Sequence, residues 1–163
     1  MGLKLDDLED LYLTRSYTFE QLKRTKVKDF SIQLNVLLRQ LSKKYEPLSP
    51  LEMEKIINTS NMECLIVRQE DRIVGLVMMT VKRDFRRSCA YIDNLVVDES
   101  HQGKHIGHNL MIRMIEIAEG MYLSHIDLTC NPDRIAANHL YRSLGFEKVG
   151  EVNGSNYYRK ILR

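Results

Sequence analysis

The sequence has little of what marks several common protein classes. Its 163 residues include only three cysteines, Cys64, Cys89 and Cys130, which lie far apart without a Cys-x-x-Cys pair. Such a set favours reduced, buried thiols in a cytoplasmic protein over a disulfide framework. No segment is rich in proline, glycine or serine, so no linker divides the chain. The longest apolar run, residues 73–81, is far too short to cross a bilayer.

An excess of charge of one sign is also lacking. The chain carries 24 basic and 22 acidic side chains, a net charge of +2, whereas proteins that bind nucleic acid through bulk charge concentrate lysine and arginine on one face. The first residues, LKLDDLEDLYL, are acidic and amphipathic, unlike a signal peptide. With 44% hydrophobic residues and the length of one domain, the chain can bury a core. We therefore expect a soluble cytoplasmic protein with neither nucleic acid nor membrane as a partner.

Helical spacing of apolar residues begins near the N-terminus. Leucines and aromatic residues in the first 26 positions, ending with Phe19 and Leu22, predict one or two short helices. We assign residues 1–26 to an N-terminal helical extension and residues 27–163 to a single domain.

Two further helices are expected in the first part of that domain. Apolar residues repeat at helical spacing over residues 30–41. The segment PLSPLEMEKIIN then carries the signature of a helix start. Ser49 can accept from the free amides, Pro50 suits the first turn, and Glu52 can close a capping box.

Short β-rich runs replace the helical pattern after residue 61. They predict strands at residues 63–69, 72–81, 90–97, 124–130, 146–152 and 156–162. Residues 70–72 predict a hairpin, and Gly75 indicates a bulge. Two helices fall between the later strands, one over residues 107–119 and one that Gly145 is placed to end in a left-handed cap.

The expected order of elements is α-α-β-β-β-α-β-α-β-β. One connection predicts a parallel crossover, because the strand ending at Val97 is followed by a helix and then by the strand at Ile126. The expected fold class is therefore α+β, with a mixed, mainly antiparallel twisted sheet flanked by helices.

The segment HQGKHIG, residues 101–107, joins a predicted strand to a predicted helix. The free amides and the dipole of a helix N-terminus bind phosphate without special side chains. Gly103 and Gly107 let the backbone approach a ligand closely. The glycine spacing matches neither a Walker loop nor the Gly-x-Gly-x-x-Gly fingerprint of dinucleotide-binding folds.

Two motifs together resemble the GNAT superfamily of acyl-CoA-dependent N-acyltransferases. Gln102-Gly103-Lys104-His105-Ile106-Gly107 is similar to the signature Gln/Arg-x-x-Gly-x-Gly/Ala, and LVVDES precedes it. One helix and one strand later, AANHLYRSLGFEKVG is similar to the family's A-x-x-L-Y-x-x-x-G-F. The resemblance covers the chain from about residue 27 onward. It implies a GNAT-like fold and an acyltransferase that uses acetyl-CoA as co-substrate and no metal.

The resemblance also implies how the cofactor is held. A bulge near Asn94 and Leu95 would open a gap between two strands for the pantetheine arm, and the amides after Gln102 would bind the pyrophosphate. The implied cofactor-binding residues are Leu95, Val97, Gln102, Gly103, Lys104, His105, Ile106, Gly107, Arg134, Asn138 and Tyr141. His105 departs from the family, which has glycine there, and its side chain restricts φ.

Three catalytic roles are implied as well. Tyr141 would protonate the departing thiolate of CoA, and the Leu95 amide would polarise the thioester carbonyl. Asp93 would accept the proton that an alkylammonium must lose before it attacks. Two structural alternatives stay open: ordinary packing of Tyr141 on its helix, and an ion pair between Asp93 and an arginine.

The implied reaction is direct transfer of acetyl to a primary amine, because neither Cys89 nor Cys130 has a histidine at a motif distance. The alternative is a non-catalytic acyl-CoA-binding or sensor module. The acceptor would be a small-molecule or peptide amine, bound by the first two helices and the turns at residues 82–88 and 152–158. A homodimer is open, because many members of the family dimerise.

Three neighbouring histidines, His101, His105 and His108, are candidate zinc ligands. A helix start in this segment would point His105 and His108 along different faces, and no acidic or thiol ligand is adjacent. Structural zinc sites need four ligands in fixed geometry, so we expect no metal.

Overall fold

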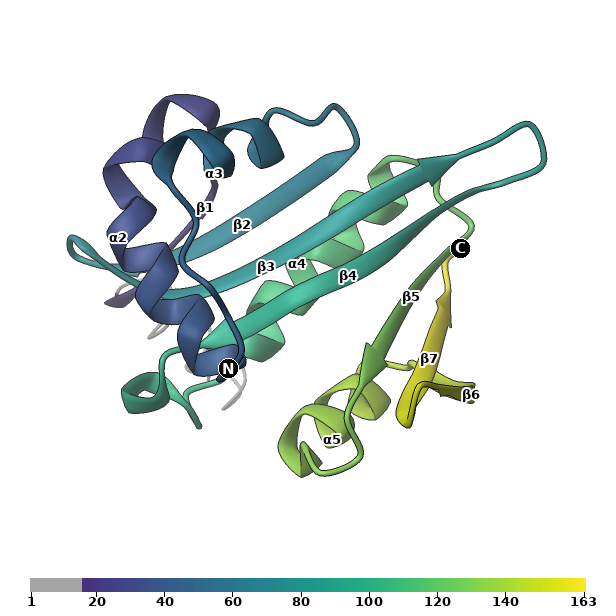
Figure 1. The fold of residues 1–163 in the computed structure, drawn as a ribbon. Helices are drawn as coiled ribbons and strands as arrows, with labels where there is room; N and C mark the ends of the chain where they lie inside the picture. The colour runs from purple at the N-terminus through teal and green to yellow at the C-terminus, as the bar shows by residue number, and fades with distance from the viewer. Residues whose placement is uncertain (1–15) are drawn as a thin grey trace, which may run out of the picture.

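The computed structural model describes residues 16–163, apart from the side chains at positions 24 and 25. Over these residues the chain forms a seven-stranded sheet with helices on both faces (Figure 1). The strands are β1 (Thr18–Gln21), β2 (Met62–Gln69), β3 (Arg72–Arg83), β4 (Ser88–Val97), β5 (His125–Cys130), β6 (Glu147–Val152) and β7 (Ser155–Ile161). The helices are α2 (Arg24–Leu41), α3 (Pro50–Ile57), the 3-10 helix η1 (Glu99–His101), α4 (Ile106–Gly120) and α5 (Ile135–Ser143). None of these helices is both long enough and apolar enough to span a bilayer.

The sheet is mixed, and its strand order is β1-β2-β3-β4-β5-β7-β6. Every neighbouring pair is antiparallel except β4 and β5, which α4 connects in a parallel crossover. The predicted α+β class and the predicted crossover are confirmed.

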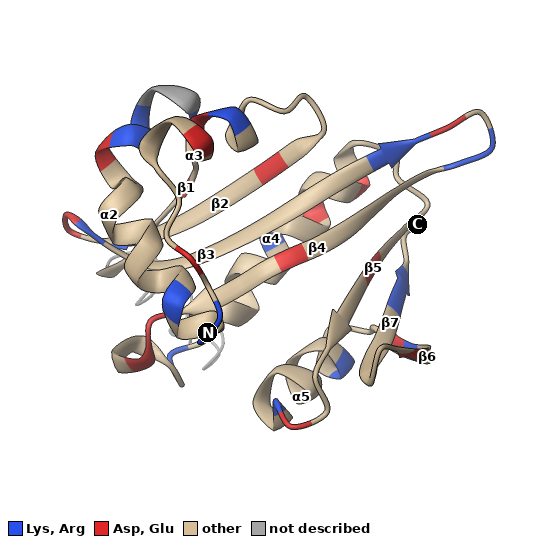
Figure 2. Cartoon of the chain, viewed as in Figure 1, with Lys and Arg blue, Asp and Glu red and all other residues tan. Residues whose placement is uncertain are grey.

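Apolar side chains form one cluster on each face of the sheet. α2 and α3 cover one face, and α4 covers the other. Most charged residues lie on helices, loops and strand ends, while the middle of the sheet is largely uncharged (Figure 2). α4 lies close to β3 because Gly75 has no side chain: a Cβ there would be 3.2 Å from Leu110 Cδ1 and 3.3 Å from Ile106 Cγ2. The bulge expected at this glycine lies beside it, where the register jumps from Val67–Gly75 to Arg68–Ile73.

The predicted helix ends are confirmed at two places. Ser49 Oγ accepts from the Glu52 amide at 3.3 Å, and Glu52 Oε2 accepts from the Ser49 amide at 2.8 Å, which completes the capping box before α3. α5 ends before Gly145, whose φ of +82° is the left-handed conformation that favours glycine.

The predicted N-terminal extension is not a separate helical unit where the structure describes it. Its first 15 residues lie outside the described part of the chain. The helix predicted around Phe19 and Leu22 is wrong, because residues 18–21 form β1 and pair antiparallel with β2. Pairing with a sheet edge, a contact with a distant segment, outweighs the local apolar spacing. The boundary predicted after residue 26 falls inside α2.

β4 and β5 diverge, and this divergence creates the candidate site (Figure 1). The two strands pair only at Ala90–Ile126 and Tyr91–Asp127. Beyond Tyr91, β4 has a bulge: its register with β3 shifts, and Asn94 has a φ of +52°. The bulge predicted near Asn94 is confirmed.

Candidate active site

A cavity of about 620 Å³ opens where β4 and β5 separate. Its walls come from the end of β4, the turn between η1 and α4, and α5. Most of the residues implied to bind the cofactor line this one cavity, namely Leu95, Val97, Gln102, Gly103, His105, Gly107 and Arg134. The fold therefore brings both sequence motifs to the same place, although a helix and a strand separate them in the chain.

The turn into α4 is held by side-chain hydrogen bonds. Asp98 accepts from the Ser100 amide at 3.0 Å, and Gln102 Nε2 donates to the Val97 carbonyl at 3.2 Å. Although burial opposes ionisation of Asp98, hydrogen bonds from Ser100, Gln40 and His101 hold its pKa well below the usual range. The Asp98 carboxylate thus stays charged and anchors the start of the turn.

Two implied residues of this turn do not line the cavity. Lys104 is exposed to solvent. The Ile106 side chain is buried in the core, so only its backbone can face a ligand. Gly103 has a φ of +74°, a conformation that explains the need for glycine at this position.

His105 occupies the N-cap of α4 in the left-handed conformation, with φ +59° and ψ +12°. Such angles are uncommon for residues with a side chain, although histidine tolerates them better than most. The motif that this segment resembles has glycine at this position, and the left-handed backbone gives the physical reason. The exposed imidazole lies edge-on to the ring of His108, with centroids 6.3 Å apart.

Tyr141 lies on α5, near enough to Cys130 of β5 and Tyr91 of β4 to interact with both electrostatically. It is 4% exposed, and its ring packs edge-on against Phe146. Burial raises the pKa of Tyr141 to about 12, and the nearby Cys130 of β5 acts in the same direction. No hydrogen bond to its hydroxyl occurs among residues 16–163. Tyr141 is not itself a lining residue of the cavity, and its phenol stays protonated at neutral pH.

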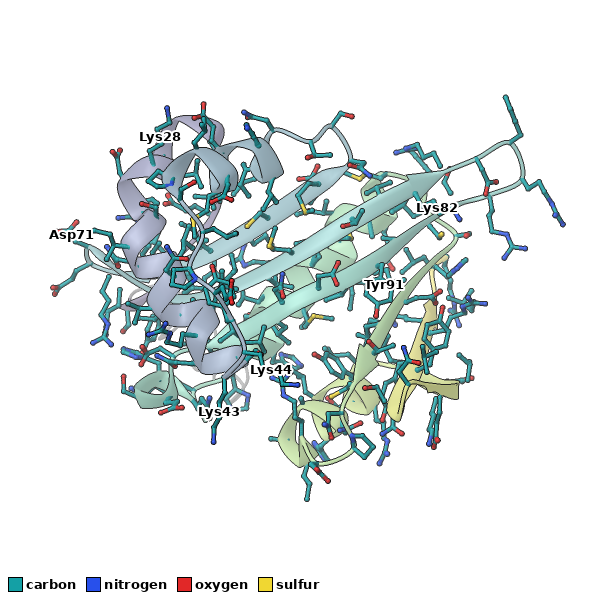
Figure 3. The ribbon with its side chains drawn as sticks, viewed as in Figure 1. Lys28, Lys43, Lys44, Asp71, Lys82 and Tyr91 are labelled. Carbon is teal, nitrogen blue, oxygen red and sulfur yellow. The ribbon has the colours of Figure 1, made fainter. Side chains whose placement is uncertain are left out.

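Tyr91 marks the closed end of the divergence. From β4 it points toward β5, and its hydroxyl lies 2.6 Å from Thr129 Oγ1 (Figure 3). The two strands are therefore linked here and separate beyond this point.

Asn138 is buried, and its amide is fully occupied within the protein. Its Nδ2 donates to the carbonyls of Asn131 and Arg134, both at 2.8 Å. Its Oδ1 accepts from the Tyr158 hydroxyl at 2.8 Å and from Asn156 Nδ2 at 2.9 Å. These four bonds use the donors and acceptors of the amide. The Asn138 side chain thereby joins β7 to α5, the helix that carries Tyr141, and the implied contact of Asn138 with the cofactor stays a prediction.

Asp93 is half-buried on β4 and lines a second cavity, beneath α2 and α3. It makes neither a hydrogen bond nor an ion pair with any described residue, so the arginine partner considered as an alternative does not occur in this part of the chain. Burial raises the pKa of its carboxyl above the ordinary value. An unpaired carboxylate of raised pKa is suited to accepting a proton.

The buried thiols are poor nucleophiles. Burial raises the pKa of Cys64 to about 12 and also raises the pKa of Cys130. Since the thiolate is the reactive form, neither is poised for acyl transfer. No group of three or more metal-ligating side chains gathers anywhere in the described chain. His101 instead places its ring nitrogens near Ser100 and Gln69.

Sequence reasoning missed the contribution of α2 to the 620 Å³ cavity and to the turn beside it. Gln40 and Leu41, in the last turn of α2, line the 620 Å³ cavity. Gln40 Oε1 accepts from the Glu99 amide at 3.0 Å, which ties α2 to η1. The amphipathic pattern revealed the helix, but no local signal showed which distant loop its end would contact.

Comparison with known proteins places this geometry in a family. A model of the acetyltransferase (GNAT) family matches residues 33–146. Human N-acetyltransferase 8B is 27% identical over 106 residues, which cover 61% of this chain. The match spans 47% of that relative, about half of its length.

Solved structures share the fold at low sequence identity. An aminoglycoside acetyltransferase from an uncultured soil metagenomic sample, in complex with trehalose, is 22% identical, with a TM-score of 0.75, and the match covers 86% of this chain and 96% of that one. A GNAT-family acetyltransferase from Streptococcus pneumoniae is 18% identical, with a TM-score of 0.75 and coverage of 90% and 99%. A putative acetyltransferase from Salmonella typhimurium, yncA, solved with its cofactor acetyl-CoA, is 16% identical, with a TM-score of 0.72 and coverage of 91% and 95%.

Proposed function

This chain belongs to the acetyltransferase (GNAT) family, and we propose that it transfers the acetyl group of acetyl-CoA directly to a primary amine. One observation carries the proposal. The divergence of β4 and β5 opens one cavity, and this cavity is lined both by the turn before α4 and by α5, the helix that bears Tyr141. A relative solved with acetyl-CoA and another solved with CoA and a peptide have the same fold.

The residues of the cavity suit acetyl-CoA, which would supply the activated acetyl thioester. The free amides at the start of α4 would hold the pyrophosphate, each contact with the helix charge contributing about 0.3–1 kcal/mol. Gly103 and Gly107 allow close approach of the backbone, and Lys104, which is exposed in the same turn, adds a cation. From Ile92 to Val97, β4 has no strand partner on the side of β5, so its backbone can pair with the pantetheine arm.

Three groups would divide the chemistry. Asp93 accepts a proton from the acceptor ammonium, directly or through water, and the free amine then bonds to the acetyl carbon. The Leu95 amide donates to the carbonyl oxygen, where negative charge develops. The carbon–sulfur bond breaks, and the Tyr141 hydroxyl donates its proton to the sulfur. The proton that the attacking nitrogen loses as it becomes an amide restores the Tyr141 hydroxyl, directly or through water. The raised pKa of Cys130 is consistent with direct attack in place of a covalent acyl-enzyme.

The test is thiol release from acetyl-CoA with a panel of amines, with mass spectrometry of the acetylated product. The panel includes an aminoglycoside and a peptide, because relatives are described with these ligands or substrates. Tyr141→Phe is expected to lower kcat about 10²-fold or more while the Kd for acetyl-CoA stays unchanged. The matched control is Tyr122→Phe, at a fully exposed tyrosine after α4, which should leave both values unchanged.

The opposite result would favour the non-catalytic reading. If acetyl-CoA binds tightly, no amine is acetylated and Tyr141→Phe has no effect, the chain is an acyl-CoA-binding or sensor module.

A further inference from the structure

A second cavity, of about 250 Å³, lies between the sheet and the helices α2 and α3. Its walls are mostly apolar, and the side chains that define them include Leu34, Leu38, Met53, Ile57, Leu76 and Met78. Methionine and cysteine sulfurs lie between these helices and the strands (Figure 3). An apolar site of this kind favours an apolar ligand, because burying such a ligand removes apolar surface from water.

Among the described residues, one charged group faces this apolar space. Asp93 is the only carboxylate among the described lining residues, and it has no partner in this part of the chain. Tyr45, which also lines the cavity, donates its hydroxyl to Asn35 Oδ1 at 2.7 Å. The walls therefore complement a ligand that has a single positive charge and an otherwise apolar body. A ligand with several charges would bury its additional charges without partners, which would weaken its binding.

The two cavities meet at the bulge of β4. Leu41 lines both of them. Asp93 and Asn94 line the apolar cavity, while Leu95, the next residue, lines the 620 Å³ cavity that is proposed to bind acetyl-CoA. Because Asn94 has a left-handed backbone, the side chains of Asp93 and Leu95 do not face the same cavity, as alternate residues of a regular strand would. An ammonium group beside Asp93 would thus lie next to the Leu95 amide, where the thioester is proposed to bind.

We propose that the apolar cavity holds the acceptor, and that the acceptor is a small free primary amine carried on an alkyl or aryl group. This rests on the proposed function and specifies its substrate class. The volume supports the assignment, because an apolar cavity of about 150 Å³ holds a benzene molecule. The space beneath α2 and α3 therefore accommodates a ring with a short chain that ends at Asp93, or a linear chain of similar size.

The experiment compares kcat/KM for the linear amines from propylamine to hexylamine, with 2-phenylethylamine, ethanolamine, spermidine, an aminoglycoside and a short peptide with an N-terminal leucine. We expect kcat/KM to rise about fourfold with each added methylene, because each buried methylene contributes about that factor. Hexylamine and 2-phenylethylamine should exceed ethanolamine and spermidine by more than tenfold.

A pair of variants locates the effect. Ile57→Trp places a larger side chain in the cavity wall on α3, so the rise along the series should stop at a shorter amine and kcat/KM for hexylamine should fall at least tenfold. Leu51→Trp is the matched control, because Leu51 lies on the same helix, is 56% exposed and does not line the cavity. Calorimetry with acetyl-CoA should give the same Kd for both variants and the parent chain, which shows that Ile57→Trp still folds.

The possible failures are distinguishable. A flat alkylamine series, or a preference for ethanolamine, spermidine or the aminoglycoside, overturns this inference and leaves acetyl transfer to amines intact. A peptide preferred over hexylamine by tenfold overturns the assignment to a free amine. Acetylation of none of the amines overturns the proposed function and this inference together. An equal loss of hexylamine activity in Leu51→Trp also counts against the cavity as the binding site.

Discussion

Replacing His105 by glycine should stabilise the protein, although it removes a side chain. His105 has a φ of +59°, a region that costs a residue with a Cβ about 1–2 kcal/mol. Glycine avoids that cost, but it loses about 0.5–1 kcal/mol more backbone entropy on folding. The imidazole is exposed, so the variant loses little buried surface, but it also loses interactions of His105, among them the ring contact with His108. The two backbone effects alone raise the free energy of unfolding by about 0.5–1 kcal/mol, and the lost interactions subtract from that gain.

Urea denaturation measures this difference, and thermal unfolding checks it. For a chain of this size, the gain corresponds to a rise in Tm of about 1–4 °C. His108→Gly is the matched control, because it removes the same edge-on ring contact from a residue inside α4. Glycine within a helix is less favourable than histidine, so the control should lose a few tenths of a kcal/mol. The two substitutions should thus have opposite signs.

The reasoning is refuted if His105→Gly lowers the free energy of unfolding by as much as His108→Gly does. Calorimetry with acetyl-CoA then answers a separate question about the same residue. An unchanged Kd means that the imidazole is a tolerated departure from the family's glycine. A weaker Kd, together with the gain in stability, means that the imidazole contacts the cofactor.

Three further outcomes are expected. Asp93→Asn should lower kcat/KM about 10²-fold or more, because only the carboxylate accepts a proton. The activity of the parent chain should fall with decreasing pH through a pKa above the ordinary aspartate value, because burial raises the pKa of Asp93. A loss of activity that begins only near pH 4 or below would contradict this. Asn138→Ala should lower the free energy of unfolding, measured by urea denaturation, by about 2–4 kcal/mol, because it leaves the buried donors of Tyr158 and Asn156 without their acceptor. A loss below about 1 kcal/mol would contradict the importance of this hydrogen-bond network. Gly75→Ala should destabilise the chain by about 1 kcal/mol, because the added Cβ would crowd α4. Gly120→Ala should not destabilise it, because the space around that Cβ is open. Equal shifts in Tm for the two variants would refute the packing argument.

Much of the fold could be predicted from local patterns. The capping box at Ser49, the left-handed cap at Gly145 and the bulge near Asn94 all agree with the structure. Each depends on the chemistry or backbone freedom of a few consecutive residues, or on a family motif that preserves them. The helix around Phe19 was wrong because pairing with β2 decided the conformation of that segment.

The candidate site also has features that the sequence predicted and features that only the structure revealed. The motif at residues 102–107 indicated a phosphate-binding turn, but the position of Gln40 beside that turn depends on how α2 packs against the sheet. The sequence identified Asn138 as a motif residue and could not show that its amide is occupied by partners from β7. Hydrogen-bond partners from distant strands are set by the assembled sheet.

By itself the sequence determined the class of the fold, the family and the residues of the two motifs, because periodicity, caps and motif spacing are local properties. Only the tertiary structure decided that Asp93 lacks an ion-pair partner among the described residues and that Leu41 lines both cavities. These features arise where α2, β4 and α5 converge, and segments so far apart in the chain meet only when the core is packed. The separation of β4 from β5, which no single strand encodes, opens the 620 Å³ cavity that we propose binds acetyl-CoA, beside the apolar cavity.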